Sequence, residues 1–157
     1  MTDSEFAAFR AQAVRDYATE KVAAGEWPKE RAPSLAEEQT AALLPDGKGT
    51  EGMFIVMADA DDVGPVGYAW LALKGPEVSC AWIHDISIDE EHRGKGYGRA
   101  LLNGLEQVAR EHDLESIALN VFAGNDYARQ LYERAGYKPT SIHMCKSLDD
   151  EPGSTPS

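Results

Sequence analysis

The chain has 157 residues, of which 43% are apolar and 27% are charged, the balance of a folded soluble protein. Its length suits one domain with a sizeable core, and no apolar run approaches the ~18 residues that a membrane span needs. The formal net charge of −12 argues against nucleic acid as a partner, because phosphates attract a basic surface. The charge fits a cationic partner such as an amine, but acidic surfaces also serve solubility alone.

The N-terminus and the cysteines bear on where the protein works. The stretch MTDSEFAAFR has neither the basic nor the apolar region of a signal peptide, so we expect a cytoplasmic protein. Cys80 and Cys145 are too few for a disulfide framework, and we expect reduced thiols rather than a bridge or a metal pair. We expect one domain over residues 1–148 and a disordered, acidic and polar tail over residues 149–157.

The N-terminal part of the chain predicts two helices. Thr2 and Glu5 have the spacing of a capping box, and apolar side chains then recur at helical intervals to about residue 24. Ser34 and Glu37 repeat that spacing, which predicts a second helix from Ser34 to about residue 44. A loop follows, and the pattern then changes to strands.

The rest of the chain alternates strands and helices. We expect strands over residues 53–58, 65–73, 79–88 and 116–122, helices over 98–112 and 125–135, and an extended segment over 137–148. Short turns rich in Gly and Asp join the first strands, which indicates an antiparallel series. The order predicts an α/β or α+β fold with a mixed, mainly antiparallel sheet and helices on both faces.

A glycine-rich turn precedes the helix that we expect at residue 98. Residues 90–102 read EEHRGKGYGRALL, with glycines at positions 94, 96 and 98. Glycines here leave backbone N–H groups free to approach a ligand, and a helix N-terminus adds partial positive charge. The spacing excludes a Walker A loop and the dinucleotide fingerprint Gly-x-Gly-x-x-Gly. We therefore predict a phosphate or pyrophosphate site, supplemented by Arg93, Lys95 and Arg99.

The segment from Ile83 to Lys146 resembles the GNAT superfamily of N-acetyltransferases. The family signature is Arg/Gln-x-x-Gly-x-Gly/Ala, which the run RGKGYG (93–98) satisfies after the apolar strand end ISID (86–89). Downstream, LNVFAGNDYARQLYERAGY (119–137) is similar to the family's second motif. The matching residues there are Asn125, Leu131, Tyr132, Gly136 and Tyr137. Two motifs in this order cover about 60 residues of the C-terminal half.

The resemblance implies acetyl-CoA, or another acyl-CoA, as the acyl donor, and we expect no metal. The pyrophosphate would bind backbone N–H groups in the turn, and the pantetheine arm would lie along the strand that ends at Ile88. The implied donor-binding residues are Ile86, Ser87, Ile88, Arg93, Gly94, Lys95, Gly96, Tyr97, Gly98, Arg99 and Asn125. The chain departs from the family at both ends. We expect the family's first strand to be missing or contributed differently, and its last strand to be merged or short.

The chemistry that the resemblance implies is attack by an amine on a thioester. An alkylammonium with a pKa of about 10.4 must lose a proton first, which costs roughly 4–5 kcal/mol at pH 7. Tyr132 takes the position of the family's general acid, which protonates the leaving thiolate. His84 and Asp85 are both candidates for the base, directly or through a water, and we expect them on opposite faces of their strand. Water, another residue or an acceptor of low pKa are the alternatives.

Together these features predict an N-acetyltransferase that transfers an acetyl group from acetyl-CoA to a primary amine by direct attack. The alternative is a non-catalytic acyl-CoA-binding sensor or partner protein on the same fold. The acceptor is open between small amines, antibiotics, amino acids, peptide N-termini and protein lysines. We expect neither nucleic acid nor membrane as a partner, and an open sheet edge could pair two copies as a homodimer.

Overall fold

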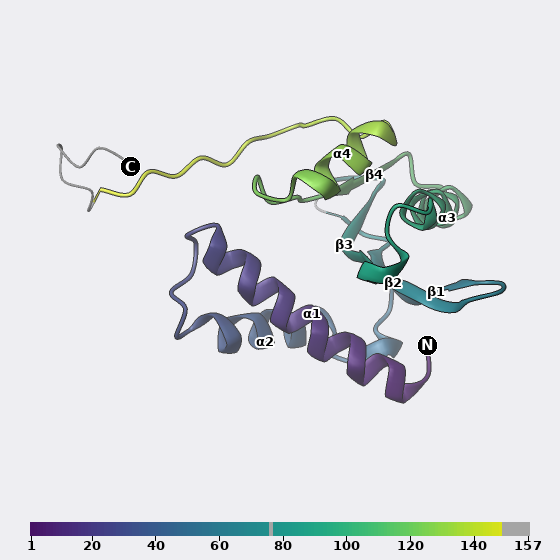
Figure 1. Cartoon of the computed structure of the whole chain (residues 1–157), viewed down its shortest axis with the longest axis horizontal. Helices are drawn as coiled ribbons and strands as arrows, with labels where there is room; N and C mark the ends of the chain where they lie inside the picture. Colours follow the sequence, from purple (N-terminus) through teal and green to yellow (C-terminus); the bar gives the residue numbers. More distant parts are fainter. Residues whose placement is uncertain (76, 149–157) are drawn as a thin grey trace.

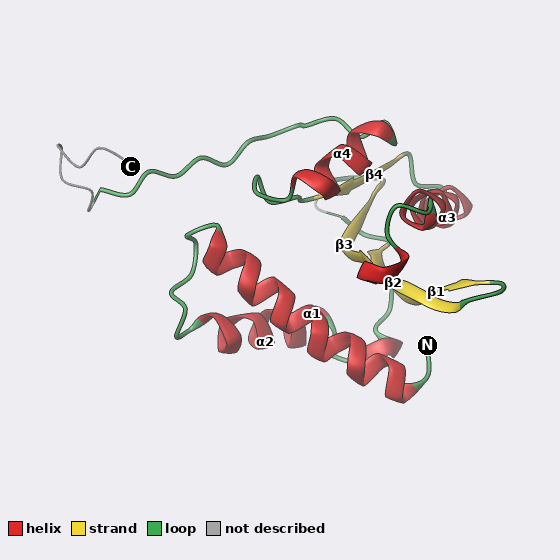
Figure 2. Cartoon of the chain, in the orientation of Figure 1, coloured by secondary structure: helices red, strands yellow, loops and turns green. Residues whose placement is uncertain are grey.

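The computed structural model describes residues 1–75 and 77–148. Two helices come first, then three strands, then a helix, a short strand and a last helix (Figures 1 and 2). The elements are α1 (Asp3–Ala23), α2 (Ala32–Leu43), β1 (Met53–Ala60), β2 (Gly64–Ala72), β3 (Cys80–Ile88), α3 (Tyr97–Glu111), β4 (Ser116–Leu119) and α4 (Asp126–Arg134). This mixed α/β architecture confirms the predicted fold class.

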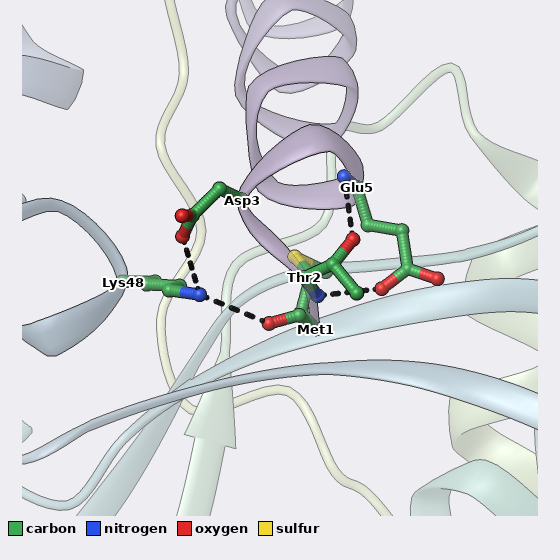
Figure 3. Close-up of polar contacts among 5 residues, drawn as sticks. All are labelled: Met1, Thr2, Asp3, Glu5 and Lys48. Atoms are coloured by element: carbon green, nitrogen blue, oxygen red, sulfur yellow. Dashed lines mark hydrogen bonds and ion pairs between the residues drawn. The ribbon is translucent and has the colours of Figure 1, made fainter.

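The predicted capping box at the start of α1 is confirmed (Figure 3). The Thr2 hydroxyl accepts a hydrogen bond from the Glu5 amide at 3.2 Å, and the Glu5 carboxylate accepts one from the Thr2 amide at 2.6 Å. The ammonium of Lys48 lies 2.5 Å from the Asp3 carboxylate and donates to the Met1 carbonyl at 3.3 Å. These contacts tie the start of α1 to the turn that precedes β1.

The capping box predicted for the second helix is wrong. α2 begins before Ser34, with Arg31 as its N-cap residue, and the Ser34 hydroxyl donates to the Arg31 carbonyl at 3.0 Å. Pro33 lies in the first turn, where its fixed φ suits a helix and its missing N–H costs no bond, so the helix starts ahead of it. Glu37 instead pairs with Arg10 of α1 at 2.5 Å and joins the two helices.

The four described strands form one sheet in the order β1-β2-β3-β4. The first three pair antiparallel, as predicted, and β4 pairs parallel to β3 over only four residues. β4 ends at Leu119, three residues earlier than we predicted, because the chain then turns toward α4. A Cβ at Gly67 would lie 2.1 Å from the Ser87 carbonyl oxygen, so only glycine allows β2 and β3 to approach this closely.

The two faces of the sheet carry separate cores. Ala69 and Leu71 of β2 pack with buried side chains of β3 and α3 on one face. Tyr68 and Trp70, which alternate with them along β2, pack with Phe9 and other residues of α1 on the opposite face. Helices therefore cover both faces, and α1 lies over the one from which the polar residues of the site project.

At the ends of the chain we expected a first strand that is missing or contributed differently and a last strand that is merged or short; the described residues hold neither strand. Within residues 1–75 and 77–148, no strand precedes α1 and none follows α4. Residues 138–148 extend away from α4 as an exposed segment (Figure 1). The tail predicted over residues 149–157 lies outside the described residues. No described helix is both long enough and apolar enough to cross a bilayer.

Candidate active site

A cavity of about 690 Å³ lies between α1 and α2, the sheet, and the segment from β4 to α4. It brings together most of the residues that the sequence singled out. Those that line it are His84, Asp85, Ile86, Ser87, Ile88, Arg93, Gly98, Asn125 and Tyr132. The other predicted residues do not line it: Gly94, Lys95 and Gly96 lie in the turn next to the cavity, and Tyr97 and Arg99 lie in the first turn of α3.

The strands β3 and β4 separate beside this cavity. Their pairing covers Cys80–Ile83 of β3 and ends there, whereas β3 continues to Ile88 against β2. From residue 84 onward, the outer edge of β3 has no paired strand among the described elements. Ile86, Ser87 and Ile88 thus offer an open strand edge at the cavity, where an extended ligand can add as a strand would.

The glycine-rich turn presents a row of free amides. Gly94 and Gly96 adopt positive φ values of 73° and 88°, which side chains disfavour, and α3 starts directly after them. None of the amide N–H groups of residues 94–99 has a hydrogen-bond partner within the described chain. Gly98 serves a different purpose, because a Cβ there would lie 3.1 Å from Leu131 of α4. The row of donors at a helix N-terminus suits a phosphate group.

The basic side chains of this turn divide into two kinds. Arg93 donates through Nε to the Ile88 carbonyl at 2.9 Å, and it lines the cavity. Arg99 donates to the Arg134 carbonyl at 2.9 Å and so closes the C-terminal end of α4. Lys95 is exposed on the turn. The prediction that all three side chains supplement a phosphate site therefore fits Arg93 and Lys95 better than Arg99.

A β-bulge places the two candidate bases on the same side of the sheet. Trp70 pairs with Asp85, and the next residue of β2 pairs with Ile83, so His84 is the extra residue of the bulge. The His84 ring lies on the Trp70 ring, with centroids 4.5 Å apart and an angle of 30°. Asp85 accepts a hydrogen bond from the Tyr68 hydroxyl at 3.1 Å. The prediction that His84 and Asp85 face opposite ways is wrong, because it assumed an unbroken strand.

The surroundings of these two residues change their proton affinities in opposite directions. Burial lowers the pKa of His84 to about 4, so the ring is neutral at pH 7 and a weak base. Burial raises the pKa of Asp85 to about 6, against the hydrogen bond from Tyr68, which favours the ionised form. Asp85 is ionised at pH 7, close to its pKa, and the same charge and burial hold the pKa of Tyr68 far above its usual range.

Tyr132 projects from α4 into the cavity. Burial, and then the charges of Asp85 and Glu20, raise its pKa to about 12, so its hydroxyl is protonated at pH 7. The ring lies 5.8 Å from the Tyr137 ring, and the hydroxyl has no hydrogen-bond partner among the described residues. Asn125 is the N-cap of α4, where its side chain accepts from the Ala128 amide at 3.2 Å. The cap orients the helix that carries Tyr132.

Sequence reasoning missed two acidic residues of the cavity, Asp16 and Glu20 of α1. They lie four residues apart, beside Ala13 and Tyr17 on the stripe that we predicted from apolar residues alone. Burial, followed by the charges of Asp85 and Asp16, raises the pKa of Glu20 to about 7. The signal that could have found them is an acidic i, i+4 pair bordering a buried helical stripe.

Comparison with known proteins decides the family. The profile of the Acetyltransferase (GNAT) family matches residues 12–137, which include α4, the glycine-rich turn and most of α1. The chain belongs to the GNAT acetyltransferase family. Its membership confirms the resemblance that the two sequence motifs indicated, and GNAT enzymes normally use acetyl-CoA and act on amines.

The GNAT relatives include chains that match over almost their whole length. The uncharacterised N-acetyltransferases YycN and YdgE of Bacillus subtilis are 35% and 33% identical over 150 residues. These matches cover 94% of this chain and 96% and 95% of the relatives. A crystal structure of YycN superposes with a TM-score of 0.89 at 34% identity, covering 96% of each chain.

A more distant solved structure shares the fold. AAC(6')-Iy, solved in complex with the bisubstrate analogue CoA-S-monomethyl-acetylneamine, superposes with a TM-score of 0.59. It is 14% identical, and the match covers 94% of this chain and 93% of that one. At this identity the likeness concerns the fold alone.

Proposed function

We propose that this GNAT protein transfers an acetyl group from acetyl-CoA to a primary amine by direct attack in a ternary complex. The observation that carries the proposal is that three features lie at or next to one cavity: the open edge of β3, the free amides at the start of α3, and the Tyr132 hydroxyl, which has no partner among the described residues. Each feature suits one part of acetyl-CoA: the strand edge suits the pantetheine arm, the amides suit the pyrophosphate, and the tyrosine hydroxyl suits the thioester sulfur.

The donor would be bound mainly by the main chain. The amides of residues 94–99 can donate to pyrophosphate oxygens, with Lys95 and Arg93 adding positive charge nearby. The edge of β3 from Ile86 to Ile88, where the Ile88 carbonyl already accepts from Arg93, can pair with the amide groups of the pantetheine arm. This arrangement directs the thioester into the cavity between Asp85 and Tyr132, which both line it.

Asp85 is the base that the site favours for the acceptor amine. Moving a proton from an ammonium of pKa about 10.4 to a carboxylate of pKa about 6 is uphill by ~6 kcal/mol, against ~9 kcal/mol for a ring of pKa about 4 such as His84. We assign Asp85 the proton, directly or through a water, and His84 the role of shaping the acceptor side by its contact with Trp70.

Tyr132 acts on the leaving sulfur. As the amine nitrogen bonds to the carbonyl carbon, the C–S bond breaks and the sulfur becomes a thiolate. The protonated hydroxyl of Tyr132 donates a hydrogen bond to that sulfur and then its proton. The nitrogen of the new amide loses its second proton to solvent, and the proton that Asp85 took from the ammonium restores the tyrosine through solvent. The products are the amide, the CoA thiol and one proton for each ammonium consumed.

Two measurements test this proposal together. Calorimetry with acetyl-CoA reports donor binding, and release of the CoA thiol against a panel of amines reports turnover. The proposal predicts both binding and amine-dependent release. Binding without release for any amine class would favour the alternative, a non-catalytic acyl-CoA sensor, and absence of binding would refute both.

A further inference from the structure

The cavity has opposite charge at its two ends. Arg93, next to the free amides of the glycine-rich turn, gives the donor end positive charge. The other end holds three carboxylates, those of Asp16 and Glu20 from α1 and Asp85 from β3. The proposed reaction uses only Asp85, so the two carboxylates of α1 have no role in the chemistry described above.

These carboxylates lack positive partners within the described chain. None of the three forms an ion pair there; the Asp16 carboxylate accepts a hydrogen bond from the Gln12 amide at 2.7 Å, and the Glu20 carboxylate accepts none within the described residues. The cations beside them on α1 contact other groups: Arg15 donates to Gln12 at 2.7 Å, and Lys21 pairs with Glu26 and lies over the Tyr17 ring at 5.6 Å from its centroid. The half-buried Glu20 therefore faces the cavity with its charge uncompensated, and its raised pKa follows from that environment.

Aromatic rings complete this end of the cavity. Tyr17 of α1, Trp70 of β2 and Trp82 of β3 line it together with the carboxylates. Aromatic walls bury the methylene chain of an alkylamine, and their faces attract an ammonium. Asp16 and Glu20 are one helical turn apart, ~6 Å, so two carboxylates can flank one cation.

We propose that the acceptor is a small amine with a second cationic centre, a diamine or polyamine. Glu20 and Asp16 bind its distal ammonium while its other nitrogen reaches Asp85 and Tyr132. This inference rests on the proposed acetyl transfer and names the acceptor class of the same site. A monoamine of equal chain length would fill the aromatic part of the cavity and leave the two α1 carboxylates without a partner.

The test compares 1,4-diaminobutane with butylamine at ~150 mM salt, which screens the general attraction of an acidic protein for cations. We expect kcat/KM for the diamine to exceed that for the monoamine at least tenfold. Glu20→Gln should reduce this ratio at least fivefold, through KM of the diamine. Glu38→Gln removes the same charge from an exposed position of α2 outside the cavity and should leave the ratio within twofold. A wild-type ratio near one, or an equal loss for both amines in Glu20→Gln, would overturn the inference.

A binding measurement separates this inference from the reaction itself. In this experiment 1,4-diaminobutane is titrated into wild type, Glu20→Gln and Glu38→Gln, each saturated with CoA, and calorimetry gives the affinity of each protein for the diamine. Weaker binding by Glu20→Gln alone supports the acceptor site even if no amine is acetylated, an outcome that would refute the proposed function only. Equal affinity of the three proteins overturns the acceptor site, whatever the turnover.

Discussion

Replacing Asp85 by Asn should make the protein more stable and less active. The ionised carboxylate is half-buried at the cavity, and the folded protein raises its pKa to about 6 from an ordinary value near 3.9. A pKa difference of about two between the folded and unfolded states corresponds to ~3 kcal/mol. The folded protein loses this much stability when Asp85 ionises. Asn is neutral and can still accept the hydrogen bond of Tyr68, so Asp85→Asn should gain about 2–3 kcal/mol in the free energy of unfolding at pH 7.

The pH dependence of that gain follows from the direction of the pKa change. Between pH 4 and pH 6 the folded protein holds a proton on Asp85 that the unfolded chain has released, so wild-type stability from this group falls as pH rises. Below pH 4 the carboxyl is protonated in both states, and the advantage of Asp85→Asn should disappear. Urea unfolding of wild type and Asp85→Asn at pH 7 and pH 4 measures the difference in their free energies of unfolding. Asp61→Asn, at an exposed position, is the control and should change the free energy of unfolding by less than ~0.5 kcal/mol.

The same substitution tests the base. Asp85→Asn should lower kcat/KM by at least tenfold and remove the rise of the wild-type rate with pH near 6. A variant that is less stable than wild type at pH 7 would refute the reasoning about burial, because it would mean that the charge of Asp85 stabilises the fold. A stable variant with full activity would refute its role as base.

Three further predictions concern packing, capping and association. Gly98→Val should lower both thermal stability and acetyl-CoA affinity, because its side chain would collide with α4. Gly104→Ala is the control: its side chain would enter open space beside α3, so the free energy of unfolding should rise by ~0.5–1 kcal/mol, measured by thermal unfolding. Thr2→Ala removes the capping box and should cost ~1 kcal/mol, read from urea unfolding and from the far-UV helical signal. A homodimer is predicted from the exposed apolar side chains of Ile142 and Met144 and from the open edge of β4. Light scattering should give twice the chain mass for wild type and the chain mass for the double variant Ile142→Asp, Met144→Asp. A monomeric wild type would contradict this prediction.

Features that depend on local sequence were predictable here. The capping box of Thr2 and Glu5 needs only two side chains at fixed spacing, and it forms. The glycine-rich turn also acts through its own backbone, so the positive φ values at Gly94 and Gly96 follow from the residues themselves. Asp85 and its neighbours on β3 line the same cavity because they are consecutive residues of one strand, which the sequence shows.

Features that depend on distant parts of the chain were not predictable. The bulge at His84 arises from the register between β2 and β3, which one strand does not reveal. Asp16 and Glu20 look like ordinary exposed helix residues until α1 docks on the sheet and turns them toward Asp85. The start of α2 depends on Pro33, whose effect outweighs the cap signal of Ser34.

The central claim is that the Tyr132 hydroxyl serves the chemistry of an acetyl transfer. The most direct measurement is the release of CoA thiol from acetyl-CoA by wild type and Tyr132→Phe, with the acetyl-CoA affinity of both proteins measured in parallel. The hydroxyl has no partner within the described chain, so its removal should leave folding and donor affinity intact and lower kcat at least tenfold. Equal kcat for the two proteins would contradict the account and leave Tyr132 as a packing residue.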